Sequence, residues 1–164
     1  MLKMKIEGVM LDVKSNQPII VLKDEKNRIL PISVGIFEAQ AIAFAMEGVH
    51  IPRPLTHDLI KNIIEKLEAK LLKIEINELK GNTYFAKLMF KSKNGREEAV
   101  DSRPSDAIAI ALRLKVPIYA EESLLLNKEI SSKPISDTEV KKFKEIIENI
   151  PTDDIWKELK GKEK

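Results

Sequence analysis

The sequence has no cysteine, which removes several kinds of chemistry at once. Disulfide bonds, thiolate zinc sites and cysteine nucleophiles are all excluded, and the composition suits a reducing compartment. The N-terminal stretch MLKMKIEGVM has charges among its apolar residues and lacks the apolar core of a signal peptide. No apolar run approaches the roughly 20 residues of a membrane span. We therefore expect a cytoplasmic protein without a membrane segment.

Net charge and aromatic side chains are also scarce. The 28 Lys and Arg residues nearly balance the 26 Asp and Glu residues, which leaves a formal net charge of +2, and aromatic residues make up only 5% of the chain. Proteins that bind nucleic acid over a broad surface usually have a basic groove with stacking aromatics. Any site for a polyanion must therefore be local and built from a few placed cations. The high content of Lys, Glu and Ile is typical of a thermophile.

The chain matches itself when it is shifted by 68 residues. Residues 4–46 and 72–114 share 10 identities in 43 positions without a gap, including the triplet KIE at 5–7 and 73–75. The strongest block aligns EAQAIAFAM (38–46) with DAIAIALRL (106–114). The shared apolar pattern favours a duplicated unit over chance matching of Ala and Lys.

Both units show three β-type runs followed by an apolar helix. The runs of the first unit are KIEGVML, PIIVLK and RILPISV, with a helix at about 37–47. Those of the second are LLKIEINEL, TYFAKLMF and REEAVDS, with a helix at about 105–114. Both helices are apolar almost all round, so we expect both to be buried. Strands joined by hairpin-length turns ahead of each helix predict an α+β fold with a mostly antiparallel sheet.

A third helix is predicted between the two units, at about 57–69. Its apolar residues fall on one face: Leu59, Ile60, Ile63, Ile64 and Leu67. KVPIYA (115–120) predicts a further strand, after which the chain turns polar. Ser136 and Glu139 then form a capping box ahead of an amphipathic helix. We therefore expect one domain over residues 1–125 with a C-terminal helical extension over 126–164.

Polar residues of unusual placement concentrate in two segments, PRPLTHD (52–58) and DSRPSDA (101–107). Each has Arg-Pro, then a hydroxyl residue, then an acid, ahead of an apolar helix. The match is not part of the repeat, because the shift of 68 places Arg103 opposite Gly35 and Asp106 opposite Glu38. The two segments are therefore predicted to be the two halves of one asymmetric site.

Helix capping is the simplest explanation of either segment alone. Proline suits the approach to a helix, and Thr56 and Ser105 are ordinary N-cap residues. An acid in the first turn, such as Asp58 or Asp106, is favoured by the helix dipole. His57 by itself is more typical of a capping or surface residue than of a catalytic base. Two arginines, two helix N-termini and several acids together exceed what capping requires.

The combined set fits phosphodiester hydrolysis. Arginines and helix N-termini both favour phosphate oxygens, which makes phosphate ligands of Arg53, Arg103, Thr56 and Ser105. Carboxylates among them are explained if Mg²⁺ or Mn²⁺ bridges them to the phosphate, and the candidate metal ligands are Asp58, Asp101, Asp106 and Glu38. Histidine changes charge near neutral pH, so a general acid or base is expected among the catalytic residues, which are His57, Asp58 and Asp106.

Three blocks of this sequence resemble the bifunctional nuclease domain family: PISVGIFEAQAIAFAMEG (31–48), PRPLTHDL (52–59) and VDSRPSDAIAIALRLKVPIYA (100–120). The resemblance covers roughly residues 1–125. It implies a nuclease that acts on both DNA and RNA, an α+β fold and a homodimer. The family's motif residues fall on Glu38 and Ala39, on 52–58 and on 101–107, with Ser102 where alanine is more usual.

Two other classes of protein stay open on the residues alone. A non-catalytic module that binds a nucleotide or another phosphate compound would use the same arginines, and the near-neutral charge and few aromatics favour it mildly. In an oligomeric scaffold the polar segments would only cap helices. The distance between the Arg53 and Arg103 segments distinguishes these classes from a nuclease.

Overall fold

Two sets of three strands and a helix follow one another in the computed structural model, which describes residues 1–13, 15–49, 52–126 and 132–134. The first set is β1 (Leu2–Asp12), β2 (Pro18–Lys23), β3 (Ile29–Ser33) and α1 (Ile36–Glu47). The second set is β4 (Lys70–Lys80), β5 (Thr83–Lys91), β6 (Glu97–Ser102) and α3 (Pro104–Leu114). Between the sets lies α2 (Thr56–Lys66), and after them come β7 (Ile118–Ala120), the 3₁₀ helix η1 (Glu122–Leu124) and β8 (Ser132–Pro134).

The bounds of the two sets agree with the shift of 68 residues. Adding 68 to the bounds of β1, 2–12, gives 70–80, which are the bounds of β4. In the same way β2 ends at 23 and β5 at 91, and α1 begins at 36 and α3 at 104. The predicted order of three strands and a helix is therefore found twice, while an origin by duplication stays a prediction.

The strands join in one sheet with the order β3-β2-β1-β7-β4-β5-β6, and β8 pairs with β1. The pairing of β4 with β7 is parallel, and the other strand pairs are antiparallel. The predicted α+β fold with a mostly antiparallel sheet is confirmed. Strand β7 links the two sets, because Ile118 is the register partner of Met4 on β1 and of Ile74 on β4.

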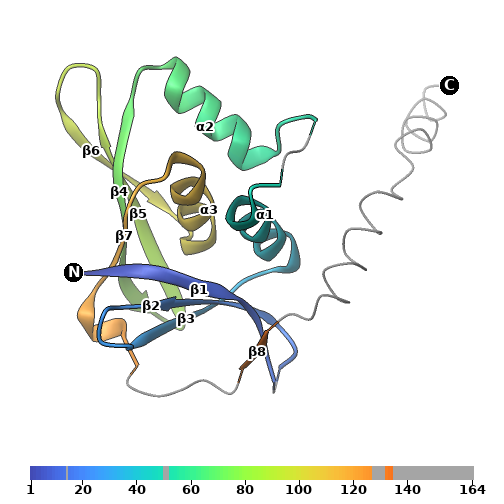
Figure 1. Ribbon diagram of the computed structural model, residues 1–164. Helices are drawn as coiled ribbons and strands as arrows, with labels where there is room; N and C mark the ends of the chain where they lie inside the picture. The colour runs from blue at the N-terminus through green and yellow to red at the C-terminus, as the bar shows by residue number, and fades with distance from the viewer. Residues whose placement is uncertain (14, 50–51, 127–131, 135–164) are drawn as a thin grey trace, which may run out of the picture. The chain divides into compact units, whose positions relative to one another are not determined.

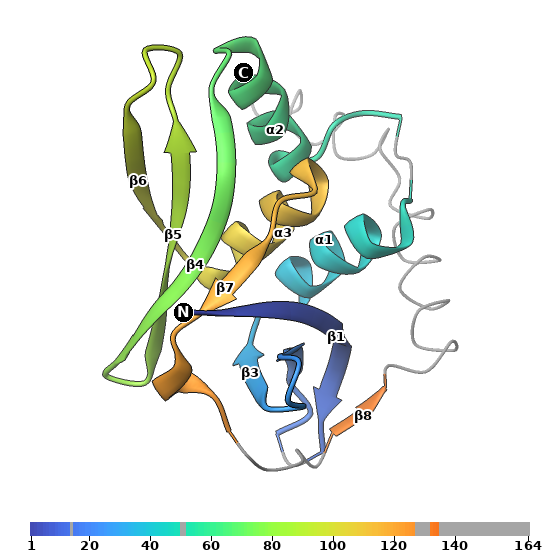
Figure 2. The ribbon, with the colours of Figure 1, turned by 60° about the vertical axis from the view of Figure 1, so that its left-hand side comes forward.

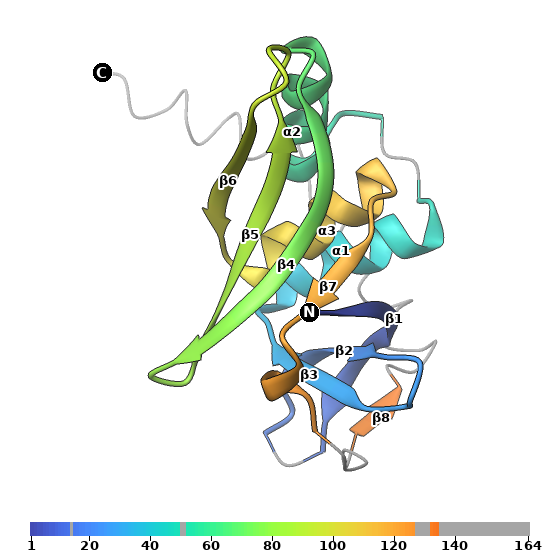
Figure 3. The same cartoon turned by 90° about the vertical axis from the view of Figure 1, so that its left-hand side faces the viewer.

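The three helices lie on one face of the sheet (Figures 1 and 2). Helix α3 is central, because it packs against α1, α2, β4 and β5, while α1 covers β1 and β2. In a view turned by 90° from that of Figure 1, β4, β5 and β6 lie in front of the helices (Figure 3). This arrangement brings the first turns of the helices, which carry the polar segments, onto the same side of the sheet.

The core is aliphatic and is centred on α3 and the strands beneath it. The largest side chains that are fully buried are Ile20, Leu22, Leu30, Ile42, Ile74, Ile76 and Ile108. Residues 104, 105 and 107–111 of α3 are buried, as the apolar sequence predicts. The same prediction is wrong for α1, whose first turn exposes Ile36 and Phe37. An apolar sequence cannot show how many neighbours will cover a helix, and α1 is exposed at its start although it packs against α3, β1 and β2.

The predicted apolar face of α2 is split by the packing. Ile64 is buried, but Leu59, Ile63 and Leu67 are exposed by 51%, 48% and 69%. Helix α2 lies at the edge of the helix layer, where α3 and β4 contact one side of it. It ends at Lys66 rather than near 69, because Glu68 has a φ of 55°, which a right-handed helix cannot continue.

The compact unit that contains the sheet runs from Met1 to Pro134. Strand β8 falls in the polar stretch at the start of the predicted helical extension over 126–164, so it is an addition to the predicted elements. The capping box at Ser136 and the amphipathic helix predicted after it lie outside the described residues. In the part of the chain that is described, no helix has the length and hydrophobicity needed to cross a bilayer.

Candidate active site

Each of the three helices has an acid at the third residue of its first turn. These acids are Glu38 in α1, Asp58 in α2 and Asp106 in α3. A carboxylate is favoured there because the first N–H groups of a helix lack partners within the helix. The fold therefore gathers three first-turn acids on one side of the sheet, two of which share an arginine.

The residues that precede these helices are not the predicted caps. Leu55 precedes α2 and Arg103 precedes α3, so the N-cap roles predicted for Thr56 and Ser105 are wrong. Pro104 occupies the first helical position, which suits its fixed φ and missing N–H, and α3 therefore begins before Ser105. In α2 the backbone N–H of Leu55 donates to Asp58 Oδ2 at 3.0 Å, so Asp58 performs the capping role.

Arg103 binds two of the three acids. Its Nε donates to Asp106 Oδ2 at 2.7 Å and its Nη2 to Asp106 Oδ1 at 3.2 Å. Its Nη1 donates to Glu38 Oε1 at 3.1 Å, which joins α3 to α1. The side chain of Arg103 is 66% exposed, so an anion in solution can reach the guanidinium.

Gly35 allows Glu38 to reach this arginine. A Cβ atom at position 35 would overlap the Glu38 carboxylate. The carboxylate therefore folds back against the start of α1, where Arg103 meets it. A side chain at position 35 would therefore force the Glu38 carboxylate to shift.

His57 brings the second sequence segment to Asp106. Its Nε2 lies 3.0 Å from Asp106 Oδ1, within hydrogen-bond distance. The side chain is 11% exposed, and its Nδ1 has no hydrogen bond to any residue that the structure describes. The segments PRPLTHD and DSRPSDA thus meet, as the sequence predicts, through an imidazole and a carboxylate. We call Glu38, His57, Arg103 and Asp106 the Arg103 cluster.

Asp106 is ionised at neutral pH. Burial favours its neutral form, but hydrogen bonds from Arg103 and His57 and the charge of Arg103 outweigh burial, so the pKa of Asp106 lies below its usual value. The hydrogen bond to Asp106 and the charge of that carboxylate raise the pKa of Arg103. The cluster therefore contains a charged carboxylate that holds both the guanidinium and the imidazole in place.

Asp58 is paired with a different arginine, Arg113 of α3. Arg113 Nε donates to Asp58 Oδ1 at 2.6 Å, and Nη1 donates to the carbonyl groups of Ala41 and Ala109. Burial opposes ionisation of Asp58, but the hydrogen bond from Arg113 holds its pKa below the usual value. Sequence reasoning missed Arg113. The signal for it was a charged residue near the end of an otherwise apolar helix.

Two predicted phosphate ligands from the first segment and one from the second lie apart from these contacts. Arg53 and Thr56 are exposed, and Arg53 has no hydrogen bond or ion pair to a described residue. Ser105 is 7% exposed, so its hydroxyl is a poor ligand for an incoming anion. Arg103 is the predicted phosphate ligand that belongs to the site, because it binds Asp106, and Asp106 contacts His57 of the other segment.

Asp101 lies on the wrong side of the sheet to join the cluster. Its register partner is Lys87 on β5. Side chains alternate along a strand, and the neighbouring Ala86 and Leu88 are buried under the helices. Asp101 and Lys87 therefore occupy the opposite face.

The predicted metal ligands do not fit a metal ion as they are arranged. The described residues contain no group of three or more His, Asp or Glu side chains that could hold one. Asp106 and Glu38 are bound by Arg103, Asp58 is bound by Arg113 and by the Leu55 backbone, and Asp101 faces the other way. Mg²⁺ and Mn²⁺ bind to carboxylate oxygens, and those of Asp58 and Asp106 already accept hydrogen bonds from arginines.

Residues 20–133, which include every member of the Arg103 cluster, match the family model of the bifunctional nuclease domain. The chain belongs to the bifunctional nuclease domain family. An uncharacterized protein of Mycobacterium tuberculosis is 38% identical over 162 residues, which cover 93% of this chain and 96% of that protein. The family resemblance seen in the sequence is therefore confirmed.

Plant relatives of this chain bear the name bifunctional nuclease. Bifunctional nuclease 2 of Oryza sativa subsp. japonica is 34% identical over 130 residues, which cover 77% of this chain and 40% of the plant protein. Bifunctional nuclease 1 of Arabidopsis thaliana is 34% identical over 111 residues, which cover 65% of this chain and 34% of the plant protein. This chain spans less than half of either plant protein.

Proposed function

We propose that this protein hydrolyses phosphodiester bonds of DNA and RNA at the Arg103 cluster. The contact between His57 and Asp106 carries the proposal, because it joins an imidazole, a carboxylate and an exposed guanidinium from two distant segments. Membership in the bifunctional nuclease domain family supports the class of reaction. The names of the plant relatives support it further.

Arg103 would bind the scissile phosphate. An arginine side chain has five N–H donors, and three bonds of Arg103 go to Asp106 and Glu38, which leaves two for phosphate oxygens. The two carboxylates fix the orientation of the guanidinium, so the Arg103 side chain would lose little conformational freedom when the phosphate binds. The positive charge would stabilise the negative charge that develops as water attacks.

His57 would transfer the proton. Asp106 lies at Nε2, which leaves Nδ1 to take a proton from the attacking water or to give one to the leaving oxygen. Asp106 would orient the imidazole and stabilise its protonated form. Asp58, the neighbouring residue, would act as a positioning residue, because its bonds to Arg113 and to the Leu55 backbone fix the first turn of α2.

Phe37 would bind a base of a single-stranded substrate. It is 80% exposed in the first turn of α1, directly before Glu38, which is bound to Arg103. Stacking of a base on an aromatic ring contributes about 1–3 kcal/mol and is tolerant of sequence. An exposed ring one residue before the acid that binds Arg103 suits a protein that lacks a broad basic groove.

A divalent metal ion, Mg²⁺ or Mn²⁺, and a homodimer stay predictions, as does a cytoplasmic location. A metal ion would have to displace Arg103 from Asp106 and Glu38, so the metal and the arginine would compete for the same carboxylates. Cleavage assays in Mg²⁺, in Mn²⁺ and in excess EDTA test the metal. Light scattering during size-exclusion chromatography tests the dimer.

The proposed function is tested with labelled single-stranded DNA and RNA oligonucleotides. His57→Ala, Arg103→Ala and Asp106→Ala should each lower kcat/KM by about 100-fold or more. Arg96→Ala, which removes an arginine outside the cluster, is the matched control and should cleave like the parent protein. Undiminished cleavage in all three cluster variants would show that the activity comes from a contaminating nuclease.

A non-catalytic phosphate-binding module is the second candidate. The pairing of the cluster carboxylates with Arg103 favours it, because a site built only to bind an anion needs no free carboxylate. Tight binding of a mononucleotide without metal and without turnover, lost in Arg103→Ala, would establish this function.

A further inference from the structure

Helix α2 leaves an apolar stripe exposed on its outer face. The stripe consists of Leu55, Leu59, Ile63 and Leu67, which follow one another at intervals of four residues, and all four are exposed. Side chains four residues apart lie one above the other on a helix, so the stripe is continuous over about 18 Å at about 1.5 Å per residue. Single apolar side chains on a surface are common, but a continuous row indicates a contact surface.

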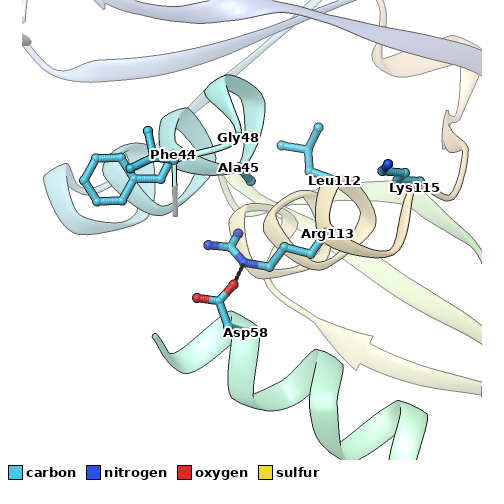
Figure 4. Close-up of a pocket in the computed structure, with 8 residues that line it drawn as sticks. Phe44, Ala45, Gly48, Asp58, Leu112, Arg113 and Lys115 are labelled. Carbon is cyan, nitrogen blue, oxygen red and sulfur yellow. Dashed lines mark hydrogen bonds and ion pairs between the residues drawn. The ribbon is translucent and has the colours of Figure 1, made fainter. Parts of the chain in front are cut away.

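The inner face of α2 packs on the rest of the fold. His57 and Ile64 are buried there, and Ile60 packs against the core. The Asp58 carboxylate points toward Arg113 of α3, to which it is bound (Figure 4). Because α3 and β4 hold α2 from this side, a partner can bind the stripe on the outer side without displacing His57.

The stripe is complementary to a second copy of itself. When two α2 helices pack antiparallel about a twofold axis at Lys61, residues at equal distances before and after Lys61 face each other. Leu59 then meets Ile63 of the second copy, and Leu55 meets Leu67 of the second copy. Both copies use the same surface, as in the isologous interfaces of most dimers.

Polar groups beside the stripe are complementary in the same register. Arg53, ahead of α2, is exposed and has no hydrogen bond or ion pair to a described residue. Glu68, after α2, pairs with Lys93, yet its side chain is 62% exposed. The antiparallel arrangement brings Arg53 of one copy to Glu68 of the other. It also brings the ammonium group of Lys66, which is exposed, to the hydroxyl of Thr56, which can accept a hydrogen bond.

We propose that two copies of this protein associate through the outer faces of their α2 helices. The proposal rests on the homodimer expected of this protein and names the surface that forms it. Burial of the leucine and isoleucine side chains supplies the free energy, and the pairs of Arg53 with Glu68 fix the direction in which the helices run. A helix about 18 Å long and about 10 Å wide offers less than the roughly 800 Å² per partner of a standard interface. We therefore expect a dimer that dissociates on dilution.

Sedimentation velocity of the full chain over a range of protein concentrations tests the proposal. The mass of the parent protein should rise from 18.6 kDa toward twice that value as the concentration increases. Ile63→Glu should raise the Kd of dimerisation about 100-fold or more, because the interface would then bury two carboxylates. Leu79→Glu places the same charge at an exposed apolar residue of β4. It is the matched control and should dimerise like the parent protein.

A charge swap tests the direction of the helices. Arg53→Glu should raise the Kd about tenfold, because it sets two carboxylates against each other at both ends of the interface. The double variant Arg53→Glu with Glu68→Arg restores opposite charges and should bring the Kd back toward that of the parent protein. Arg96→Glu, in the turn between β5 and β6, is the matched control and should leave the Kd unchanged.

A parent protein that stays monomeric at every concentration would overturn the proposal together with the homodimer. A dimer that Ile63→Glu leaves intact would keep the homodimer and overturn this surface. If circular dichroism shows that Ile63→Glu does not fold, the charge swap decides, because it leaves the stripe unchanged. Failure of the double variant to restore the Kd would overturn the antiparallel arrangement. Sedimentation does not depend on cleavage, so a failed nuclease assay leaves its result intact.

Discussion

Arg28 and Arg103 each bridge two carboxylates, and the two bridges differ most in burial. Arg28 donates from Nε to Asp24 at 2.8 Å and from Nη1 to Glu122 at 2.6 Å, and its side chain is 19% exposed. Arg103 makes bonds of similar length to Asp106 and Glu38, yet its side chain is 66% exposed. The same pairing thus leaves one guanidinium covered and the other open to solvent.

The acceptors differ as well. Asp24 accepts the backbone N–H groups of Lys26 and Arg28, so it closes the turn between β2 and β3, which Arg28 then ties to η1 through Glu122. Asp106 lies against the imidazole of His57 instead. Pairing of arginine with carboxylate is therefore no mark of a functional site by itself. An exposed guanidinium and a histidine on the same carboxylate are the features that distinguish the Arg103 cluster.

The largest effect should come from His57, which has no counterpart in the Arg28 bridge. His57→Gln can keep a hydrogen bond to Asp106 but cannot transfer protons. We expect kcat to fall about 10²–10⁴-fold with little change in KM, measured on a labelled oligonucleotide. A melting curve like that of the parent protein would show that the fold is kept. If kcat is unchanged, His57 has only a structural role, and a histidine on the carboxylate no longer distinguishes the Arg103 cluster from the Arg28 bridge.

Removal of each arginine should affect different properties. Arg103→Ala should lower kcat/KM about 10²–10³-fold, because it removes the charge that faces the phosphate. Arg28→Ala should leave cleavage unchanged and lower the midpoint of urea unfolding, because it removes the side chain that ties Asp24 to Glu122. Urea denaturation and cleavage assays on both variants measure the two effects. An equal loss of activity in both variants would contradict the assignment of catalysis to Arg103 and of stability to Arg28.

Phe37 provides a further difference between the two bridges, because it is an exposed aromatic ring beside Glu38 in the sequence and is proposed to bind substrate. Phe37→Ala should raise KM for single-stranded substrates about fivefold to a hundredfold, the equivalent of one lost stacking contact. Phe37→Trp should preserve KM. Leu79→Ala removes another exposed apolar side chain, in β4, and serves as the control. An unchanged KM in Phe37→Ala would remove Phe37 from the substrate site and leave the role of His57 untouched.

Low pH should weaken the Arg28 and Arg103 bridges to a similar extent. We therefore expect pH to give the smallest difference between them. The pKa values of Asp24 and Asp106 are both lowered, against the effect of burial, by bonds that include their arginines. A lowered folded-state pKa adds stability that is complete above the unfolded value, about 3.9, and is lost as the pH falls through the folded value. The melting temperature should therefore hold down to about pH 5 and drop below about pH 4, with a smaller drop in Asp24→Asn and in Asp106→Asn. A drop between pH 7 and 6 would point to histidine instead.

The strands and helices could be predicted because their signals are local. The run PIIVLK coincides with β2, and the turn expected between TYFAKLMF and REEAVDS is found between β5 and β6, where Gly95 has a φ of 81°. The exposure of Phe37, of Leu59 and Ile63 in α2 and of Leu67 directly after it could not be predicted in this way. Periodicity shows which residues share a face of a helix, and the number of neighbours decides whether that face is covered.

The two segments that form the site, 52–58 and 101–107, could be predicted from the sequence, but the contacts between their side chains could not. The sequence pointed to His57, Arg103 and Asp106, and the fold brings them together. It also pointed to Asp101, which is two positions before Arg103 in the sequence but lies on the other face of the sheet. The register of β6 against β5 decides that face, because a pairing shifted by one residue would move Asp101 to the other side of the sheet.

The sequence by itself determined the α+β class, the order of the elements, the first-turn acids and the family. These follow from spacing within a few residues and from motifs that can be read along the chain. Tertiary structure alone decided which charges meet. Arg103 is 65 residues from Glu38, and Arg113 is 55 residues from Asp58. A hydrogen bond between charged groups forms only within about 3 Å, and the packing of α1 and α2 against α3 sets that distance.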